Sequence, residues 1–161
     1  MVRTAVLVSG GGTSLANLLD RVASGGLDAR IDQVIGSKSG LGAEARARQA
    51  CVPYDVIERR GFDSVRDYSE AIFGRVAQVD LVVCAGWLQL LEMPPSWAGR
   101  VVNIHPSLLP AFGGKGMFGL YVHRAVIDHG CKVSGCTVHY VDNTYDTGPI
   151  ILQRTCPVLD D

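Results

Sequence analysis

The sequence lacks several features that mark large classes of protein. Its 161 residues include no run of about 20 apolar residues, the length that a membrane-spanning helix needs. The chain does not open with a basic segment, an apolar stretch and a cleavage site, so we expect no secretory signal and a cytoplasmic location. Net charge is also small. The 15 Lys and Arg residues against 16 Asp and Glu give −1, which disfavours binding to nucleic acid or to a membrane surface.

The cysteines follow no pairing pattern. Their number is 5, which is odd, and no Cys-x-x-Cys motif occurs. We therefore expect reduced thiols in a cytosolic protein rather than a disulfide framework. We also expect no metal site, because Cys131 and Cys136 have no second spaced pair to complete one.

What the chain does contain is the composition of a globular domain. Apolar residues make up 47% and charged residues 19% of the 161 residues, and we expect one domain over residues 1–161. Helical spacing predicts helices over residues 15–22 and 43–50, and a third that Asp63 caps and that continues to Val76. Short apolar runs predict strands over residues 4–8, 33–36, 54–57, 80–85 and 100–104.

This alternation of strands and helices indicates an α/β fold, a doubly wound and mostly parallel sheet flanked by helices. Beyond residue 120 the pattern changes. A helix over residues 120–129 is followed by two strands over 132–141 and 150–158, which we expect to form an antiparallel C-terminal portion. In open sheets of this kind, ligands bind outside the carboxyl ends of the strands.

A glycine-rich segment, Ser9 to Ser14, follows the first predicted strand. Glycines let the backbone approach a ligand closely, and the N–H groups that open the next helix point toward an anion. Thr13 and Ser14 add hydroxyl groups. The spacing matches neither a P-loop nor the full dinucleotide-binding motif. Two interpretations stay open, a phosphate site and a plain tight turn.

The segment from Asn103 to Pro110 lies where another strand ends. Alternation places Asn103 and His105 on the same side, so an amide and an imidazole project together. The alternative is a strand terminus with a hydrogen-bonded histidine. The polar loop from Asp142 to Ile150 is either a hairpin connection with turn-capping aspartates, or the source of an aspartate that pairs with His105.

Two further segments accompany these. Residues 113–117 form a glycine-rich loop that covers a ligand or merely connects two elements, and its Lys115 is a candidate contact for phosphate. Residues 87–91 follow the central strand and are expected in the core at the same sheet edge. The histidines at 123, 129 and 139 have no partner spacing, so we interpret them as structural or solvated.

Three segments resemble the glycinamide ribonucleotide formyltransferase family, the folate-dependent enzymes of purine synthesis. Val8 to Leu15 is similar to the family's phosphate loop, and Asn103 to Pro110 to its active-site motif. Val133 to His139, leading into Asp146 to Ile151, is similar to its second motif. The resemblance covers essentially the whole chain in order. It implies a Rossmann-like formyltransferase fold and transfer of a formyl group from 10-formyltetrahydrofolate to the amine of glycinamide ribonucleotide, with no metal.

The resemblance also implies residue roles. Asn103 would stabilise the oxyanion, His105 would act as general acid or as a charged donor to it, and Asp146 would hold His105. Gly12, Thr13 and Ser14 would bind the ribonucleotide phosphate. The implied partners are small molecules, with no nucleic acid and no membrane, and the implied assembly is a monomer or homodimer. The folate pocket would be lined by Arg66, Leu88, Gln89, Leu90, Leu91, Asn103, Val141 and Asp142.

The sequence departs from the family pattern at several points. Gln89 stands where many relatives have Arg. Val65 stands near a position that is often Arg, and Arg66 is a candidate substitute one residue on. Thr13 and Ser14 replace a more usual Ser-Asn pair. Relatives run on beyond the last strand, so we expect the family's C-terminal helix to lie outside these 161 residues.

Three alternative functions stay in view. Formyltetrahydrofolate deformylase uses water as the acceptor but usually carries an additional N-terminal domain, for which 161 residues leave no room. Methionyl-tRNA formyltransferase carries a basic C-terminal domain, which a net charge of −1 does not suggest. A non-catalytic nucleotide- or folate-binding module, such as a truncated enzyme, would share the fold without the activity.

Overall fold

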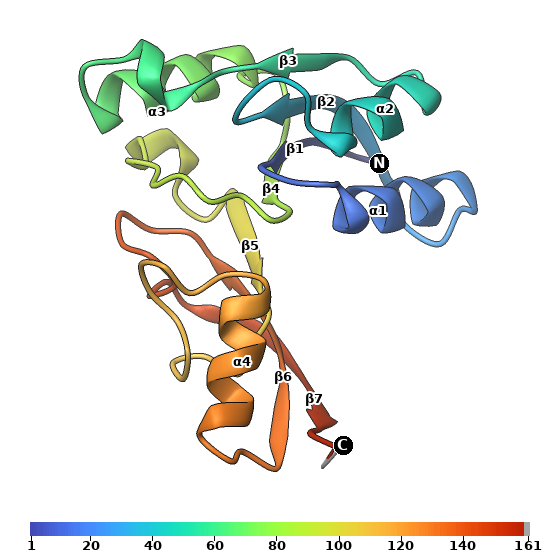
Figure 1. Ribbon diagram of the computed structural model, residues 1–161. Coiled ribbons are helices and arrows are strands. Elements are labelled where there is room, and N and C mark those ends of the chain that lie inside the picture. The colour runs from blue at the N-terminus through green and yellow to red at the C-terminus, as the bar shows by residue number, and fades with distance from the viewer. Residues whose placement is uncertain (160–161) are drawn as a thin grey trace.

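The computed structural model describes residues 1–159, and Figure 1 shows how their elements are arranged. Two short 3-10 helices, Arg59–Gly61 and Pro95–Trp97, lie between longer elements. The longer elements are β1 (Val2–Val8), α1 (Thr13–Ala23), β2 (Ala29–Gly36), α2 (Gly42–Gln49), β3 (Tyr54–Val56), α3 (Val65–Arg75), β4 (Leu81–Cys84), β5 (Val101–His105), α4 (Leu120–Asp128), β6 (Val133–Tyr140) and β7 (Ile150–Pro157).

Within the described residues, seven strands form one sheet in the order β3-β2-β1-β4-β5-β6-β7. Neighbours among β1 to β5 pair in parallel, whereas β6 runs antiparallel to β5 and β7 antiparallel to β6. The predicted fold class is therefore confirmed, including the antiparallel C-terminal portion. None of the helices in residues 1–159 combines the length and the apolar character needed to cross a bilayer.

β1 lies between β2 and β4 and is buried on both faces. Ala5 and Leu7 belong to a cluster that includes the buried side of α3. Val6 and Val8 belong to a second cluster with α1 and α2 on the opposite face. A strand covered on both faces has no polar side, which explains why residues 4–8 are apolar or small rather than strictly alternating.

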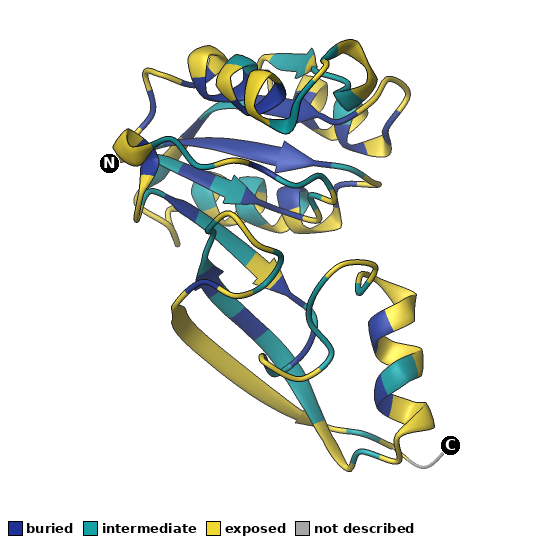
Figure 2. Cartoon of the chain, turned by 90° about the vertical axis from the view of Figure 1, so that its left-hand side faces the viewer, coloured by how far each residue is buried: buried dark blue, intermediate teal, exposed yellow. Residues whose placement is uncertain are grey.

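The antiparallel end is built differently. In Figure 1, α4 lies along the hairpin of β6 and β7, at the opposite end of the sheet from α1, α2 and α3. Every residue of β7 is exposed, whereas β6 has buried positions only in its second half. Figure 2 shows this contrast, with exposed residues along β7 and buried residues concentrated in the parallel strands.

The start of α3 differs from the sequence prediction. Ser64, not Asp63, is the N-cap residue, and its Oγ accepts a hydrogen bond from the Asp67 backbone N–H at 3.0 Å. Either side chain suits an N-cap position. The serine takes the role because its hydroxyl also donates to the Asp67 carboxylate at 2.7 Å.

The second strand is longer than predicted. β2 begins at Ala29 rather than at Gln33. Its first half contains Arg30 and Asp32, and the Asp32 carboxylate accepts from the guanidinium groups of both Arg3 and Arg30. An ion-paired strand start contains no apolar run, so the pattern that marks a buried parallel strand begins only where these charges end.

The sheet order brings three loops together. The chain enters the sheet at β1 and builds outward to β2 and β3 on one side, and to β4 and β5 on the other. Leu7 pairs with Cys84, and Cys84 pairs with Asn103, so β1, β4 and β5 end side by side. Ligand sites in doubly wound sheets form at such a point.

Candidate active site

The glycine segment after β1 turns directly into α1. Gly12 precedes the helix with φ of +76°, a conformation that glycine adopts at little cost. A Cβ at Gly12 would lie 2.8 Å from the Cα and Cβ of Ala43 in α2, so space also requires glycine here. No side chain within residues 1–159 caps α1, which leaves its first N–H groups free to bind an anion.

Asn103, His105 and Asp146 meet, as predicted, although β5 and the loop before β7 supply them separately. His105 Nδ1 lies 3.4 Å from Asp146 Oδ2, and the two side chains are 4% and 10% exposed. The Asn103 amide nitrogen lies 3.4 Å from Asp146 Oδ1. His105 Nε2 donates to the Phe112 carbonyl at 2.8 Å, and the Gly114 N–H donates to Asp146 Oδ2 at 2.9 Å.

His139 is a member of this cluster that spacing along the chain did not reveal. It is 2% exposed, and its Nε2 lies 3.1 Å from the Asn103 amide nitrogen and 3.6 Å from Asp146 Oδ1. Its Nδ1 donates to the Tyr140 carbonyl at 2.8 Å. The signal that would have found it is strand pairing, because β6 places His139 opposite Asn103.

The pKa values of the cluster reflect this packing. Burial opposes the charged form of His139, but the hydrogen bonds to Asp146 and Tyr140 and the nearby carboxylates outweigh it, so the pKa of His139 is raised. Burial likewise opposes the charge on Asp146, yet the hydrogen bonds from His139 and Gly114 and the charges of both histidines lower the pKa of Asp146. The cluster therefore favours an ionised carboxylate between two imidazoles.

The two forms of His139 use Nε2 differently. With Nδ1–H donated to Tyr140, a neutral ring leaves Nε2 as an acceptor for the Asn103 amide. A charged ring turns Nε2 into a donor toward Asp146 and removes that acceptor. A neutral His139 therefore gives the Asn103 amide a second acceptor, and a charged His139 leaves it only its contact with Asp146 Oδ1.

The loop from Asp142 to Gly148 uses its two aspartates for different tasks. The Asp142 carboxylate accepts from the Thr144 N–H and the Thr147 hydroxyl at 2.9 Å each, so it closes the turn. Asp146 has φ of +58°, the left-handed region that residues other than glycine rarely adopt. The two interpretations of this loop therefore each apply to one aspartate: Asp142 caps the turn, and Asp146 pairs with His105. The left-handed backbone is the local cost of directing Asp146 toward β5.

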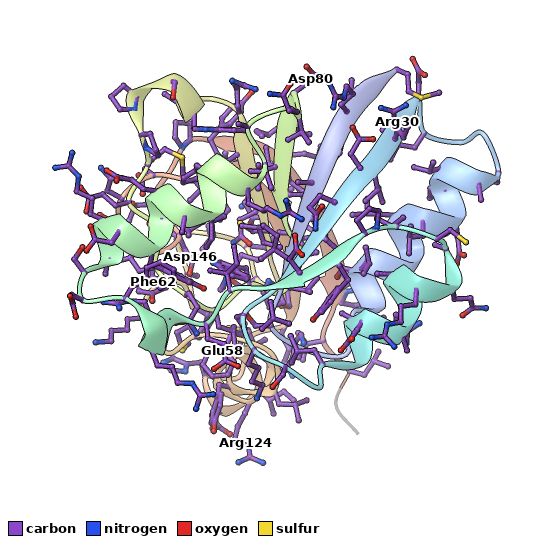
Figure 3. The ribbon with its side chains drawn as sticks, turned by 90° about the horizontal axis from the view of Figure 1, so that it is seen from above. Arg30, Glu58, Phe62, Asp80, Arg124 and Asp146 are labelled. Atoms are coloured by element: carbon purple, nitrogen blue, oxygen red, sulfur yellow. The ribbon has the colours of Figure 1, made fainter. Side chains whose placement is uncertain are left out.

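Two cavities adjoin the cluster, and both are lined by Asn103, Asp146, Trp87 and Tyr145. The smaller holds about 50 Å³, lies beside the loop after β4, and also has His139 in its wall. The larger holds about 640 Å³ and extends from His105 to the glycine loop. The Asp146 side chain, labelled in Figure 3, is 10% exposed.

Most of the predicted folate residues line the smaller cavity. These are Gln89, Leu90, Leu91, Asn103, Val141 and Asp142. Leu88 instead lines the larger cavity, and its N–H donates to Ser9 Oγ at 3.1 Å. Arg66 lines neither; it lies exposed on α3, where its guanidinium pairs with Glu70 at 3.0 Å.

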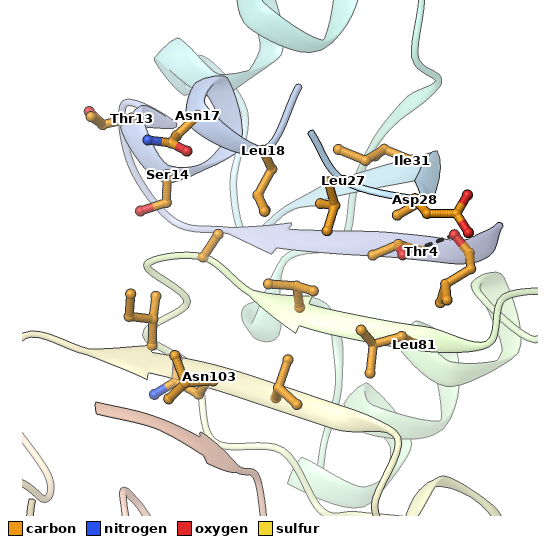
Figure 4. Close-up of a pocket in the computed structure, with 17 residues that line it drawn as sticks. Thr4, Thr13, Ser14, Asn17, Leu18, Leu27, Asp28, Ile31, Leu81 and Asn103 are labelled. Atoms are coloured by element: carbon orange, nitrogen blue, oxygen red, sulfur yellow. Dashed lines mark hydrogen bonds between the residues drawn. The ribbon is translucent and has the colours of Figure 1, made fainter. Parts of the chain in front are cut away.

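The predicted phosphate residues divide in a similar way. Ser14 lines the larger cavity together with Ser9 and Gly10. Thr13 and Ser14 also border a separate groove of about 600 Å³ over β1, β4 and β5, whose lining is mostly apolar (Figure 4). Gly12 lines neither hollow and acts through its backbone conformation. The polar groups converge on the larger cavity, so it is the better candidate for a phosphate.

An amide donor, an imidazole and a buried carboxylate at one point suit acyl transfer. That chemistry needs donors directed at an oxygen that becomes negative, and a group that moves a proton. Among residues 1–159, no group of three or more His, Cys, Asp or Glu side chains is placed to hold a metal ion.

Comparison with known proteins gives a consistent set of matches. Residues 2–161 match the family described as formyl transferase. The trifunctional purine biosynthetic protein adenosine-3 of Drosophila melanogaster is 42% identical over 165 residues, covering 99% of this chain and 12% of that protein. The chloroplastic phosphoribosylglycinamide formyltransferase of Vigna unguiculata is 40% identical over 164 residues, covering 98% of this chain and 52% of that protein. The chain thus spans from about an eighth to about half of these two relatives.

Two further matches cover more of the other protein. The phosphoribosylglycinamide formyltransferase of Haemophilus influenzae is 36% identical over 162 residues, covering 98% of this chain and 74% of that protein. The crystal structure of glycinamide ribonucleotide transformylase 1 from Symbiobacterium toebii has a TM-score of 0.90 at 39% identity, covering 99% of this chain and 75% of that one.

Proposed function

Since this chain belongs to the formyl transferase family, we propose that it transfers a formyl group from 10-formyltetrahydrofolate to the amine of glycinamide ribonucleotide, a step of purine biosynthesis. The observation that carries the proposal is the meeting of Asn103, His105 and Asp146 where two cavities adjoin. Most of the predicted folate residues line the smaller cavity, and Ser14 of the predicted phosphate residues lines the larger, so the reacting groups would meet at the cluster between them.

In the proposed reaction the substrate amine attacks the formyl carbon and forms a tetrahedral intermediate. The formyl oxygen then carries negative charge, which the Asn103 amide and a charged His105 stabilise by hydrogen bonding. The bond from carbon to the folate nitrogen breaks, and that nitrogen takes up a proton while the attacking amine loses one. His105 moves this proton, and the Asp146 carboxylate at 3.4 Å holds the imidazolium in place.

The Phe112 carbonyl marks where the oxyanion would bind. It accepts the hydrogen of His105 Nε2 at 2.8 Å. In the proposed complex the formyl oxygen replaces this carbonyl as the acceptor. Phe112 has φ of +54°, an uncommon conformation for a bulky residue, so a shift of this segment relieves strain.

The remaining features follow the family resemblance. We propose that Ser14 and the N–H groups of α1 bind the ribonucleotide phosphate. The folate is a substrate, and no metal takes part. We further propose a cytoplasmic monomer or homodimer whose partners are small molecules, with neither nucleic acid nor membrane involved.

A release assay tests the proposal. Purified protein is mixed with 10-formyltetrahydrofolate, with and without glycinamide ribonucleotide, and the absorbance change on release of tetrahydrofolate is followed. Release that depends on the ribonucleotide is the expected result. Release without the ribonucleotide would favour a deformylase, and binding of both ligands without release would favour a non-catalytic module.

A further inference from the structure

We propose that Lys115 binds the anionic group of the substrate in the larger cavity, and that this group is a phosphate monoester. The proposal rests on the proposed function for the identity of the substrate. Lys115 lines that cavity and is the only Lys or Arg among the residues that form its wall within the described chain. Ser9, Gly10 and Ser14 line the same cavity.

The backbone next to Lys115 is bonded to the reacting groups. Phe112, three residues before it, accepts from His105, and Gly114, directly before it, donates to Asp146 at 2.9 Å. Gly114 and Gly116 have φ of +99° and +88°, values that residues with side chains rarely adopt. These two hydrogen bonds hold the loop against the cluster. Lys115 directly follows Gly114, the residue that bonds to Asp146.

The charge of Lys115 has no partner among the residues that the structure describes. Its side chain makes no hydrogen bond or ion pair with any of residues 1–159. The one carboxylate in the cavity wall, that of Asp146, already faces His105, Asn103 and the Gly114 N–H. An ammonium group at the wall of a cavity with no other cationic Lys or Arg is suited to a ligand that brings its own negative charge.

The charge balance of a phosphate supports the same assignment. A phosphate monoester carries about −1.5 to −2 at neutral pH. The N-terminus of α1 offers the equivalent of about +0.5, and the serine hydroxyls are neutral. These groups alone leave most of the phosphate charge uncompensated, and Lys115 supplies one further positive charge in the same cavity.

The position of Lys115 favours the ribonucleotide over the carboxylates of the folate. The smaller cavity, which holds most of the predicted folate residues, has no member of residues 113–119 in its wall. The larger cavity includes Gly114 to Gly119 and the glycine loop after β1.

Calorimetric titration without folate tests the assignment. Glycinamide ribonucleotide and, separately, inorganic phosphate are titrated into the wild type, Lys115→Gln, Lys115→Arg and Arg124→Gln. Arg124 is exposed on α4, lines neither cavity and lies at the rim of the molecule in Figure 3. Its replacement with Gln is therefore the matched control, because it removes one positive charge away from the cavity. We expect Lys115→Gln to weaken binding of both ligands about tenfold, because one charge-assisted contact is lost.

The controls decide between outcomes. Lys115→Arg should bind within about twofold of the wild type, since the charge remains. Arg124→Gln should bind as the wild type does. An unchanged affinity of Lys115→Gln would overturn the assignment, as would an equal loss in Arg124→Gln. A loss confined to 10-formyltetrahydrofolate, titrated in a parallel arm, or a wild type that binds neither anion, would also overturn it.

Failure of the proposed function gives a different result. In that case the release assay with wild-type protein shows no dependence on the ribonucleotide. The comparison of phosphate affinities still separates Lys115→Gln from Arg124→Gln, because it requires no turnover.

Discussion

The parallel half and the antiparallel half of the sheet contribute differently to the candidate site. From β1 to β5 the strands are covered by helices, and their loops supply the glycine segment, residues 87–91 and the paired Asn103 and His105. From β6 onward the strands are more exposed, and this half supplies His139 and Asp146. β5 is the boundary between them.

The difference indicates a division of tasks. Backbone groups at the ends of buried parallel strands are rigid, which suits the proposed binding of a phosphate and of a folate. The second histidine reaches the site through the register between β5 and β6, which is set by long-range pairing. The carboxylate reaches it through a turn that Asp142 closes by a local hydrogen bond. If this division holds, substitutions in the two halves should separate binding from proton transfer.

The largest effect is expected at the boundary itself. Replacing His105 with Ala removes the donor and the proton carrier, so kcat should fall by roughly 10²–10⁴-fold while ribonucleotide affinity stays nearly unchanged. Steady-state kinetics and calorimetry measure the two quantities. A mutant that turns over at the wild-type rate would contradict a role for His105 in the reaction.

A smaller loss is expected from the antiparallel half. Asp146→Asn keeps the size of the side chain and tolerates the left-handed backbone, but it removes the charge beside both imidazoles. We expect kcat to fall about 100-fold. The pKa of His139 should also fall, because the Asp146 carboxylate is the foremost of the groups that raise it against burial.

Nuclear magnetic resonance titration of the His139 ring measures that shift. An unchanged His139 titration would show that the carboxylate does not act on this histidine, even if the rate falls.

The parallel half should respond in stability and binding instead. Gly12→Ala places a Cβ 2.8 Å from Ala43 in a left-handed conformation. We expect a loss of about 3 kcal/mol in the free energy of unfolding, together with weaker phosphate binding. Gly25→Ala is the matched control, since its φ is +72° and no atom lies within 4 Å of the added Cβ.

In the control we expect a loss of only about 1 kcal/mol, from backbone strain alone. Denaturant unfolding of the two variants measures the difference. Equal losses would mean that the contact with α2 does not constrain the glycine loop.

The smallest effect is a dependence on pH. The pKa of His139 is raised in the folded chain above its ordinary value of 6.5. The stability gained from its protonation is therefore fully present below pH 6.5 and is lost as the pH rises through the folded-state pKa. The stability advantage of the wild type over His139→Gln should shrink by about 1 kcal/mol or less from pH 6 to 8. Unfolding curves at several pH values test this, and an advantage independent of pH would contradict it.

Local patterns predicted the parts of the site that lie on continuous segments. The glycine loop before α1 and the Asn103 and His105 pair at the end of β5 follow from apolar runs and alternation. The sequence left two interpretations of the loop before β7 open, and in one of them an aspartate pairs with His105. The distance of 3.4 Å between His105 Nδ1 and Asp146 Oδ2 shows that Asp146 does so.

Contacts between distant segments could not be predicted in this way. His139 meets Asn103 because β6 is antiparallel to β5 in one particular register, and a shift of one residue would turn His139 to the other face. Ser64 takes the cap position over Asp63 through a contact with Asp67 that spacing does not distinguish. Arg66 is a candidate substitute one residue away from a position that is often Arg, but it pairs with Glu70 on the exposed surface of α3.

The left-handed backbone at Asp146 also limits which substitutions this position can accept during evolution. Only Asn, Asp and Gly adopt that conformation at low cost, and Asn is a single-nucleotide step from Asp. The easiest substitution at this position therefore discards the carboxylate and keeps the shape of the loop. On the proposed function, a descendant with Asn at position 146 would fold and hold its ligands but react about 100-fold more slowly, which is a first step by which a duplicated gene loses catalysis and keeps binding.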